Sequence, residues 1–184
     1  MKNVVYRFSI SNVIETYKRK ILESSGKDIY TTAIYEPPAK PCYRTSSGGV
    51  KTECNKSVYI NLTALVNNLI RENGIEHGFV ICSSDHTTSS VYVNHFELGL
   101  MEDLHKYLNK TFPFSPAKYK HNIWDREFAN GAAHMKAMMM GKSATVLISD
   151  GKLHLGKFDD IIYAEFDYRP DKTFVISLFS EEEQ

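Results

Sequence analysis

The stretch GFVICSSDHTTSSVYVN, residues 78–94, sets the pattern from which the fold is predicted. Residues 78–82 are almost all apolar, which is typical of a buried strand, and residues 90–94 alternate between apolar and polar side chains, which is typical of a strand with one buried face. The polar segment between them is too short for a helical crossover. Because few connections along the chain are longer, we expect mainly antiparallel pairing.

Strands and helices follow one another on both sides of this stretch. We expect strands at residues 4–8, 57–60, 144–149, 152–156, 161–167 and 173–179, the last two as an antiparallel pair around residues 168–172. Apolar residues at helical spacing predict three or four helices, within residues 13–22, 62–70, 98–108 and 130–140. Asn12 with Glu15 resembles a capping box, Asn61 or Thr63 is suited to cap the second helix, and Asn130 is suited to cap the last. We therefore expect a single compact α+β domain with mainly antiparallel sheet.

The composition of the chain argues against a nucleic-acid partner and against a membrane partner. The 184 residues carry 22 Lys and Arg against 22 Asp and Glu, so a strongly electrostatic contact with nucleic acid is not expected. No apolar run approaches the roughly 20 residues that span a bilayer, and the first residues lack the core of a signal peptide. The three cysteines form no CxxC motif, and Cys82 lies in the apolar run as a reduced core residue. We expect a cytoplasmic protein without a nucleic-acid or membrane partner.

Residues 36–56 form a separate segment that is rich in Pro, Gly, Ser and Thr. Such a composition predicts a loop, and a mobile surface loop is the simplest interpretation. A phosphate cradle is the alternative, although the spacing of a P-loop is missing. Cys42 and Cys54 lie in this loop, and a cytosolic setting argues against a disulfide between them.

Two motifs place a histidine where an apolar core does not call for one. His134 ends the stretch NGAAH, residues 130–134, and His86 lies in DHTT, residues 85–88, directly after the apolar run. Together with His121 they form a set that is able to ligate zinc and leave one coordination position open for water or substrate. The alternative is that all three are ordinary surface or hydrogen-bonded histidines, because their spacing is too wide to be a motif in itself.

Other residue types in this part of the chain have two interpretations each. Thr87 and Thr88 are suited to bind a phosphate or carboxylate, or to bond their own backbone in a turn. Methionines within residues 135–140 predict a packed or intersubunit stripe rather than a soft-metal site. Trp124 either packs in a core or stacks on a ligand, and His105 is expected to be solvated. No GxSxG or GxGxxG motif is present, so a serine hydrolase has little support.

In their order along the chain these motifs resemble the YjbQ family. The most specific block is NGAAH at residues 130–134, followed by GKS at residues 141–143; YINLT at 59–63, HTT at 86–88, GKLHLG at 151–156 and EFD at 165–167 appear in the same order. The resemblance covers roughly residues 57–179 and leaves residues 1–56 as an extended lead-in and loop. It implies one YjbQ-like α+β domain over residues 1–184 that assembles as a homotrimer.

The resemblance also implies an activity, in which a hydroxymethylpyrimidine diphosphate is joined to a thiazole phosphate to give thiamine phosphate and pyrophosphate. The histidine pocket would bind this small phosphorylated substrate, with zinc as the expected metal or magnesium together with the pyrophosphate. The residues assigned to it are His86, His134 and Asn130 as catalytic groups, His86, His121 and His134 as metal ligands, Thr87, Thr88 and Lys157 as phosphate ligands, and Asp159 and Glu165 as groups that hold a cation or adjust the pKa of a histidine.

The chain departs from the family pattern at several places around this pocket. It has LGKFD at residues 155–159 where family members usually have LGTWQ, and His95 where an acidic residue is usual. Arg169 is displaced from the arginine of the usual Gly-Pro-Arg segment. Two other functions are therefore kept beside the synthase: a metal-dependent hydrolase on the same scaffold, and a non-catalytic trimeric protein that binds an anion or a metal.

Overall fold

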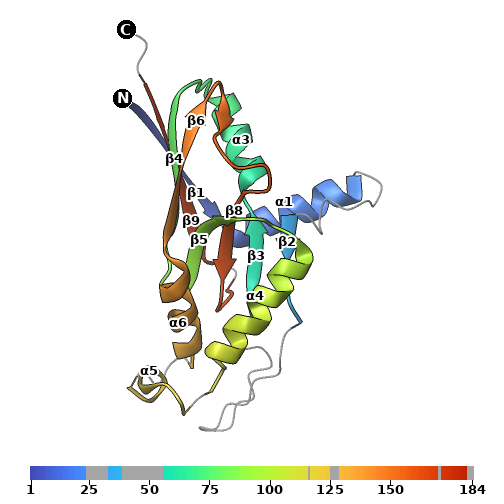
Figure 1. The fold of residues 1–184 in the computed structure, drawn as a ribbon, viewed down its shortest axis with the longest axis vertical. Coiled ribbons are helices and arrows are strands. Elements are labelled where there is room, and N and C mark those ends of the chain that lie inside the picture. The colour runs from blue at the N-terminus through green and yellow to red at the C-terminus, as the bar shows by residue number, and fades with distance from the viewer. Residues whose placement is uncertain (24–32, 39–55, 116, 125–128, 170, 182–184) are drawn as a thin grey trace.

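Two antiparallel sheets form the frame of the chain (Figure 1). The computed structural model describes residues 1–23, 33–38, 56–115, 117–124, 129–169 and 171–181. The five-stranded sheet has the order β1 (Lys2–Ser9), β9 (Thr173–Ser180), β4 (Gly78–Ser84), β6 (Ser143–Ser149) and β7 (Lys152–Leu153). The four-stranded sheet has the order β2 (Ile34–Tyr35), β3 (Val58–Asn61), β8 (Asp160–Glu165) and β5 (Ser89–Asn94). The predicted α+β class with mainly antiparallel sheet is confirmed.

Five helices lie in the described part of the chain, one more than the upper number predicted: α1 (Ile10–Glu23), α3 (Thr63–Glu72), α4 (Leu98–Thr111), α5 (Lys120–Trp124) and α6 (Gly131–Met140). The additional helix is α5, which is too short to show helical periodicity. The capping box predicted at Asn12 is wrong, because α1 begins at Ile10 and the Asn12 carbonyl accepts from Thr16 Oγ1 inside the helix. Asn61 does serve α3, since its Oδ1 accepts from the Thr63 backbone N–H at 2.9 Å.

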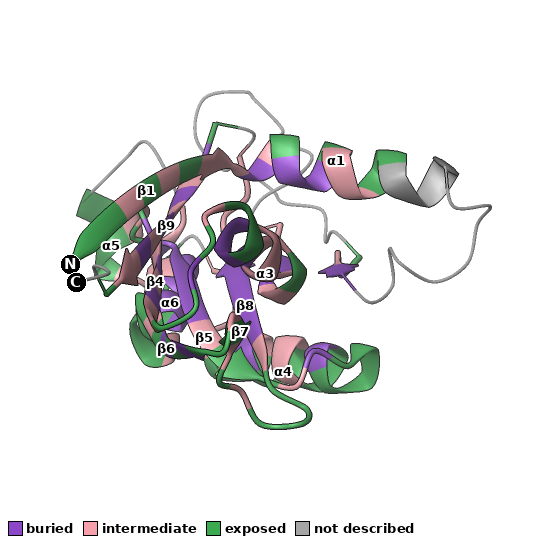
Figure 2. Cartoon of the chain, turned by 90° about the horizontal axis from the view of Figure 1, so that it is seen from above, coloured by how far each residue is buried: buried purple, intermediate pink, exposed green. Residues whose placement is uncertain are grey.

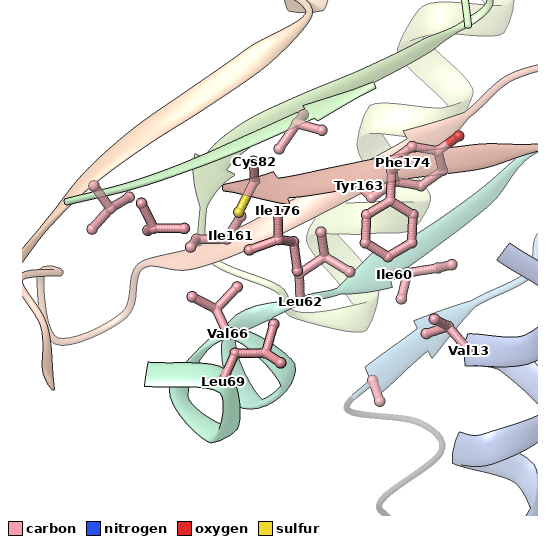
Figure 3. Close-up of a cluster of buried hydrophobic side chains, with 14 of the residues drawn as sticks. Val13, Ile60, Leu62, Val66, Leu69, Cys82, Ile161, Tyr163, Phe174 and Ile176 are labelled. Carbon is pink, nitrogen blue, oxygen red and sulfur yellow. The ribbon is translucent and has the colours of Figure 1, made fainter. Parts of the chain in front are cut away.

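The four-stranded sheet is covered on both faces, and this explains the nearly continuous apolar sequence of β8. Ile161 and Tyr163 belong to the cluster that also contains the inner face of the five-stranded sheet, α1 and α3. Ile162 and Ala164 belong to a second cluster with α4 and α6. Figure 2 shows β8 buried in the middle of the molecule, and Figure 3 shows the first cluster between the two sheets. A fully buried side chain of this size contributes about 1.5–3 kcal/mol of transfer free energy.

The antiparallel pair predicted for the last two strands is wrong. β8 pairs with β3 and β5, whereas β9 pairs with β1 and β4 in the other sheet. The apolar patterns of the two strands suit a hairpin, but β8 is buried on both faces and the inner face of β9 packs across the core against it. The connection after Glu165 therefore leads the chain from one sheet to the other instead of making a turn.

The N-terminal lead-in is part of this frame. β1 pairs along its whole length with β9, from Lys2 opposite Ser180 to Ser9 opposite Thr173. Most of the predicted loop at 36–56 lies outside the described residues, together with Cys42 and Cys54. Cys82 is a free, buried thiol as predicted, and burial raises its pKa to about 12. Within the described part of the chain, no helix combines the length and apolar character needed to cross a membrane.

Candidate functional site

The segment that follows β4 is held rigidly by its own polar groups. Ser84 Oγ accepts from the backbone N–H of His86 at 3.1 Å and donates to the His86 carbonyl at 3.0 Å. The His86 ring is engaged as well, because its Nε2 accepts from the backbone N–H of Thr173 at 3.0 Å. An accepting Nε2 must carry the lone pair, so the ring proton of the neutral form lies on Nδ1. His86 therefore ties the end of β4 to the start of β9.

His121 and His134 come together at the end of the sheets where α5 and α6 lie (Figure 1). Their ring centroids are 4.7 Å apart and the rings are nearly perpendicular, at 73°. His134 also forms a hydrogen bond with the backbone of Thr87, in the segment after β4. Two of the three histidines predicted to share a pocket are thus in contact, and the third, His86, directly precedes Thr87 in the chain.

The hydrogen bonds that Asn130 forms with Asp167 and with His121 determine which nitrogen of the His121 ring carries a proton. Asn130 Nδ2 donates to Asp167 Oδ2 at 3.3 Å, and His121 Nε2 lies 3.1 Å from Asn130 Oδ1. Because a carboxylate only accepts, the Asn130 amide must turn its NH₂ to Asp167 and its oxygen to His121. His121 Nε2 is therefore the donor. Asp167 is fixed in turn by Arg169, whose Nη2 lies 3.4 Å from the same Oδ2.

The start of α6 is docked on α5, and this docking sets the distance between the two histidines. Asn130 occupies the N-cap position as predicted, but its side chain makes no capping bond. The backbone N–H of Gly131 donates instead to Asn122 Oδ1 at 2.8 Å. A Cβ at Gly131 would lie 2.7 Å from the Cβ of Tyr119, so only glycine allows this approach.

The surroundings of His134 keep its ring uncharged near neutral pH. Burial is the main cause that lowers the pKa of His134 below its ordinary value, and the neighbouring His121 lowers it further. The bond to Thr87 and the charge of Asp167 act in the opposite direction, and the charge of Lys172 adds to the lowering. A neutral imidazole that donates one N–H to a carbonyl keeps a lone pair on the other nitrogen, so His134 is equipped to accept a proton or a hydrogen bond.

Two residues predicted as ligand contacts are instead joined to a buried lysine. Glu165 is completely buried, and its Oε1 accepts from Thr88 Oγ1 at 2.8 Å and from Lys172 Nζ at 2.7 Å. The cation that Glu165 holds is thus Lys172, and Thr88 is buried beside it. Sequence reasoning missed Lys172, because a single lysine before a strand has no periodicity or motif that singles it out.

One lysine side chain, that of Lys142, lies near the histidine pair. Lys142 Nζ donates to the backbone carbonyl of His86, the peptide group next to the one that His134 contacts. Burial lowers the pKa of Lys142, and the charges of Glu165 and Asp85 oppose this. Lys142 stands in the GKS block of the family pattern, which was the only sequence signal for it.

Lys157 and Asp159 lie at the opposite end of β8 from Glu165, and so away from the histidine pair of the same chain. Both precede β8, whereas Glu165 ends it, and a strand of this length extends about 16 Å. Asp159 Oδ2 accepts from the backbone N–H of Gly156 at 3.1 Å, which closes a turn. Lys157 Nζ lies 5.1 Å from the centre of the Phe158 ring. Their predicted roles in phosphate and cation binding stay predictions.

The predicted three-histidine metal site is not assembled by the side chains as they lie. Nε2 of His86 already accepts from a backbone N–H, and it is not in the ring contact that joins His121 and His134. Among the described residues, no group of three or more His, Cys, Asp and Glu side chains is arranged to hold a metal ion. The metal stays a prediction, and no step of the chemistry below depends on one.

Other sequence interpretations are corrected next to the site. His105 is half-buried rather than solvated, with Nε2 2.8 Å from Asn109 Nδ2 and Nδ1 3.4 Å from the Tyr59 hydroxyl. Lys136 is only 2% exposed, and its Nζ donates to Asn109 Oδ1. Met138 is well exposed on the other side of α6, as the interpretation of an intersubunit stripe requires.

The fold and this site define the class of protein: a small α+β protein of two antiparallel sheets with a histidine pair at one end. The sequence model of the family described as UPF0047 protein YjbQ-like matches residues 50–181. The chain therefore belongs to this family. The matched range contains His86, Thr88, His121, Asn130 and His134, so the whole candidate site lies within the family region.

Relatives and solved structures agree with this assignment. A UPF0047 protein of Methanothermobacter thermautotrophicus is 33% identical over 119 residues, which are 65% of this chain and 80% of that protein. A crystal structure of a YjbQ/UPF0047 family protein from Clostridium acetobutylicum has a TM-score of 0.60 at 31% identity and covers 67% of this chain and 92% of its own. A protein of unknown function from Sulfolobus solfataricus has a similar fold, with a TM-score of 0.64 at 20% identity, and covers 98% of this chain and 100% of its own.

Proposed function

We propose that the chain is a transferase for small phosphorylated substrates, with its chemistry centred on the His121–His134 pair and a reaction of the thiamine-phosphate synthase type. The observation that carries the proposal is the contact between the two rings at 4.7 Å, with hydrogen bonds that orient each ring from outside the pair. Oriented imidazoles with an uncharged member are suited to hold or move a proton at a reacting atom. The choice of substrates rests on the resemblance to the family.

The proposed reaction defines what the site must do. A bond forms between the thiazole nitrogen and the methylene carbon of the pyrimidine, and the bond from that carbon to the diphosphate oxygen breaks. Pyrophosphate leaves with the bonding electrons, and the thiazole ring becomes a thiazolium cation. The site must therefore hold the two substrates in line and stabilise the negative charge that develops on the leaving group.

Lys142 is the residue best placed to stabilise the leaving pyrophosphate. Its ammonium and the ring of His134 are held on neighbouring peptide groups, those of His86 and Thr87. Neighbouring Cα atoms are about 3.8 Å apart, so one phosphate is able to reach both groups. The Thr87 side chain is exposed between them and adds a hydroxyl donor. This trio takes the place of the phosphate ligands Thr88 and Lys157 predicted from the sequence.

His134 is the proposed proton acceptor, and His121 is its orienting neighbour. Because His134 is uncharged near neutral pH, its free lone pair is able to take a proton from the pyrimidine amino group as the diphosphate leaves and to return it once the carbon–nitrogen bond has formed, so that no net proton transfer is needed. Asn130 does not touch the substrate in this scheme: its amide holds the His121 ring in the Nε2–H form. In the proposed site, Lys142 and Thr87 thus bind the leaving pyrophosphate, and His134 accepts the proton.

The direct test is the formation of thiamine phosphate by the purified chain from the two phosphorylated substrates. We expect turnover by the wild type and a loss of about 100-fold in kcat for His134→Ala, the usual contribution of a general base. His154→Ala is the matched control, because His154 is an exposed histidine in the β7–β8 connection, away from α5 and α6. Assays with and without added zinc or magnesium show at the same time whether a divalent ion takes part.

Each alternative function has its own outcome in this experiment. Equal rates for the wild type and His134→Ala would reject the assigned site. Hydrolysis of a panel of phosphate esters, with no thiamine phosphate formed, would identify the chain as a hydrolase on the same scaffold. Pyrophosphate binding by the wild type, lost in Lys142→Ala, without turnover of any substrate would identify a binding protein.

We also propose that the chain assembles as a homotrimer. The outer face of the five-stranded sheet carries no helix among the described elements (Figure 2), and it exposes Val5 and Leu147 beside the stacked rings of Phe79 and Phe179. An uncovered apolar face of this kind is typical of a protein interface. Light scattering after gel filtration is expected to give three times the chain mass of 21.0 kDa, and Leu147→Lys is expected to lower it.

A further inference from the structure

A buried lysine with three hydrogen-bond acceptors lies behind the histidine pair. Lys172 is 7% exposed, and its Nζ donates to Thr88 Oγ1 at 2.6 Å, to Glu165 Oε1 at 2.7 Å and to the Asp167 carbonyl at 2.6 Å. An ammonium has three N–H donors, and these three acceptors use all of them. The buried charge of Lys172 thus holds together the segment at Thr88, the segment from Glu165 to Asp167 and its own segment before β9.

Glu165 is satisfied to the same degree. Besides Lys172 and Thr88, its Oε1 accepts from the backbone N–H groups of Phe166 at 3.1 Å and Asp167 at 2.9 Å, and Oε2 accepts from the Tyr163 hydroxyl at 3.1 Å. The carboxylate therefore sets the turn that directly follows β8. Breaking any member of such a network leaves a buried polar group without its partner.

One arm of this network reaches His134. Thr88 is bonded to both Lys172 and Glu165 through its hydroxyl, and its carbonyl accepts from the Phe166 N–H at 3.0 Å. The preceding residue, Thr87, supplies the backbone group that His134 contacts. The position of this peptide group, and with it the orientation of the His134 ring, follows from where Thr88 is held.

The other arm reaches His121. Both backbone polar groups of Asp167 belong to the network, since its N–H donates to Glu165 and its carbonyl accepts from Lys172. Its side chain then holds Asn130, whose oxygen accepts from His121 Nε2. A shift of the Asp167 backbone is therefore passed through one amide to the second histidine.

We propose that the buried Lys172–Glu165 ion pair, with Thr88, is a positioning device that sets the orientation of both His121 and His134. The inference rests on the proposed function for its catalytic meaning, but the orientation of the rings is measurable without any substrate. Lys172 and Glu165 act as positioning residues, because the bonds described above reach the rings through Thr87 and Asn130. Charge suits this role because a buried ion pair leaves few alternative arrangements that satisfy both ions.

The test is the ¹⁵N and ¹³C NMR spectrum of the histidine rings in the substrate-free protein, with signals assigned through His121→Gln and His134→Gln. Ring ¹⁵N shifts report which nitrogen carries the proton and whether it is hydrogen-bonded. Lys172→Met removes the ammonium and keeps the side-chain length, so the ring signals of both histidines are expected to move. Thr88→Val keeps the Lys172–Glu165 ion pair and removes the hydroxyl through which both residues hold Thr88, so the His134 signal is expected to move more than that of His121.

A control variant separates positioning from general loss of stability. Val80→Ala removes two methyl groups from a fully buried core side chain of β4 that has no polar group, so it is expected to lower the melting temperature without removing a hydrogen bond of the network. Its histidine signals are expected to stay in place. In the synthase assay Lys172→Met and Thr88→Val are expected to lower kcat more than tenfold with KM nearly unchanged, whereas Val80→Ala lowers neither.

The outcomes distinguish this inference from the proposed function. Moved ring signals without thiamine phosphate from the wild type would support the positioning device and reject the synthase. Unmoved signals in folded Lys172→Met would overturn the device whatever the enzyme does. If Lys172→Met does not fold, Thr88→Val decides, and an unmoved His134 signal in it overturns the inference.

Discussion

The two ends of β8 each carry an acidic residue bonded to a threonine, and yet they do different things. At the first end, Asp160 Oδ1 accepts from Thr63 Oγ1 at 2.9 Å and Oδ2 accepts from the backbone N–H of Phe96 at 3.2 Å. At the second end, Glu165 accepts from Thr88 but also binds the ammonium of Lys172. The first end joins elements through neutral donors, whereas the second contains a buried charge pair.

The difference lies in what each carboxylate has to support. Asp160 is partly exposed and anchors the start of α3 to the sheet, a task for which ordinary hydrogen bonds suffice. Glu165 is completely buried and, in the proposed positioning device, lies behind the His121–His134 pair whose orientation it sets. A buried ion pair contributes little net stability compared with apolar packing, so its presence at only one end indicates a demand for geometry there.

The largest effect is expected when the charge pair is broken from the carboxylate side. Glu165→Ala leaves the ammonium of Lys172 buried without its counter-ion, which is expected to cost about 3–5 kcal/mol in the free energy of unfolding. Urea denaturation followed by circular dichroism measures this value. At the other end of the strand, Asp160→Ala serves as the comparison, and a loss at least as large there would contradict the distinction between the two ends.

A smaller effect is expected where α6 meets α5, at the histidine end. Gly131→Ala places a Cβ 2.7 Å from that of Tyr119 and 2.8 Å from Asn122 Oδ1, so the helices must separate. Overpacking of this kind costs about 1–3 kcal/mol. We expect the synthase rate to fall together with stability, because the same contact sets the distance between His121 and His134. Full activity in a destabilised Gly131→Ala would show that the docking of α5 is not needed.

At the opposite end, a moderate loss of stability is expected without any loss of activity. Thr63→Val removes the hydroxyl that donates to Asp160 and accepts from the backbone N–H of Ile161 at 3.0 Å. Each such bond contributes about 1 kcal/mol. Thermal unfolding and the synthase assay, run on the same preparation, check both parts. A lowered kcat would mean that the two ends of β8 are coupled.

The smallest effect is a dependence of stability on pH at His134. Its pKa is lowered in the folded state, so the unfolded chain binds more protons in the pH range between the lowered value and the ordinary value of about 6.5. The stabilising contribution is therefore complete above that range and is lost as pH falls through it. Between pH 8 and pH 5 the wild type should lose more stability than His134→Gln, as urea midpoints at several pH values would show. Parallel pH curves for the two proteins would refute the lowered pKa.

Much of the frame was predictable because it depends on local patterns. The apolar run at residues 78–82 identifies β4, and helical spacing identifies α3 and α4. The pairing of β8 with β9 was predicted wrongly because two apolar strands joined by a short connection fit a hairpin equally well. In the structure β3 and β5 occupy both edges of β8, so β9 pairs with β1 and β4 in the other sheet.

In the candidate site, the histidine pair and Asn130 were predictable from the sequence, but the residues that support them were not. His121, Asn130 and His134 stand in or near one recognisable block, and the structure joins them. Lys172 is 84 residues from the hydroxyl that it binds, and nothing local marks a lysine as buried. The same reason explains His105, which was expected in solvent: its neighbour Tyr59 is 46 residues away.

The sequence by itself determined the class of fold, the family and the histidines, because periodicity and motif order are properties of short segments. The tertiary structure decided which strands share a sheet and which histidines meet. It also decided that the carboxylate of Glu165 holds an internal cation. These outcomes depend on distant residues that compete for the same buried space and the same hydrogen bonds, and that competition is resolved only when the chain is folded.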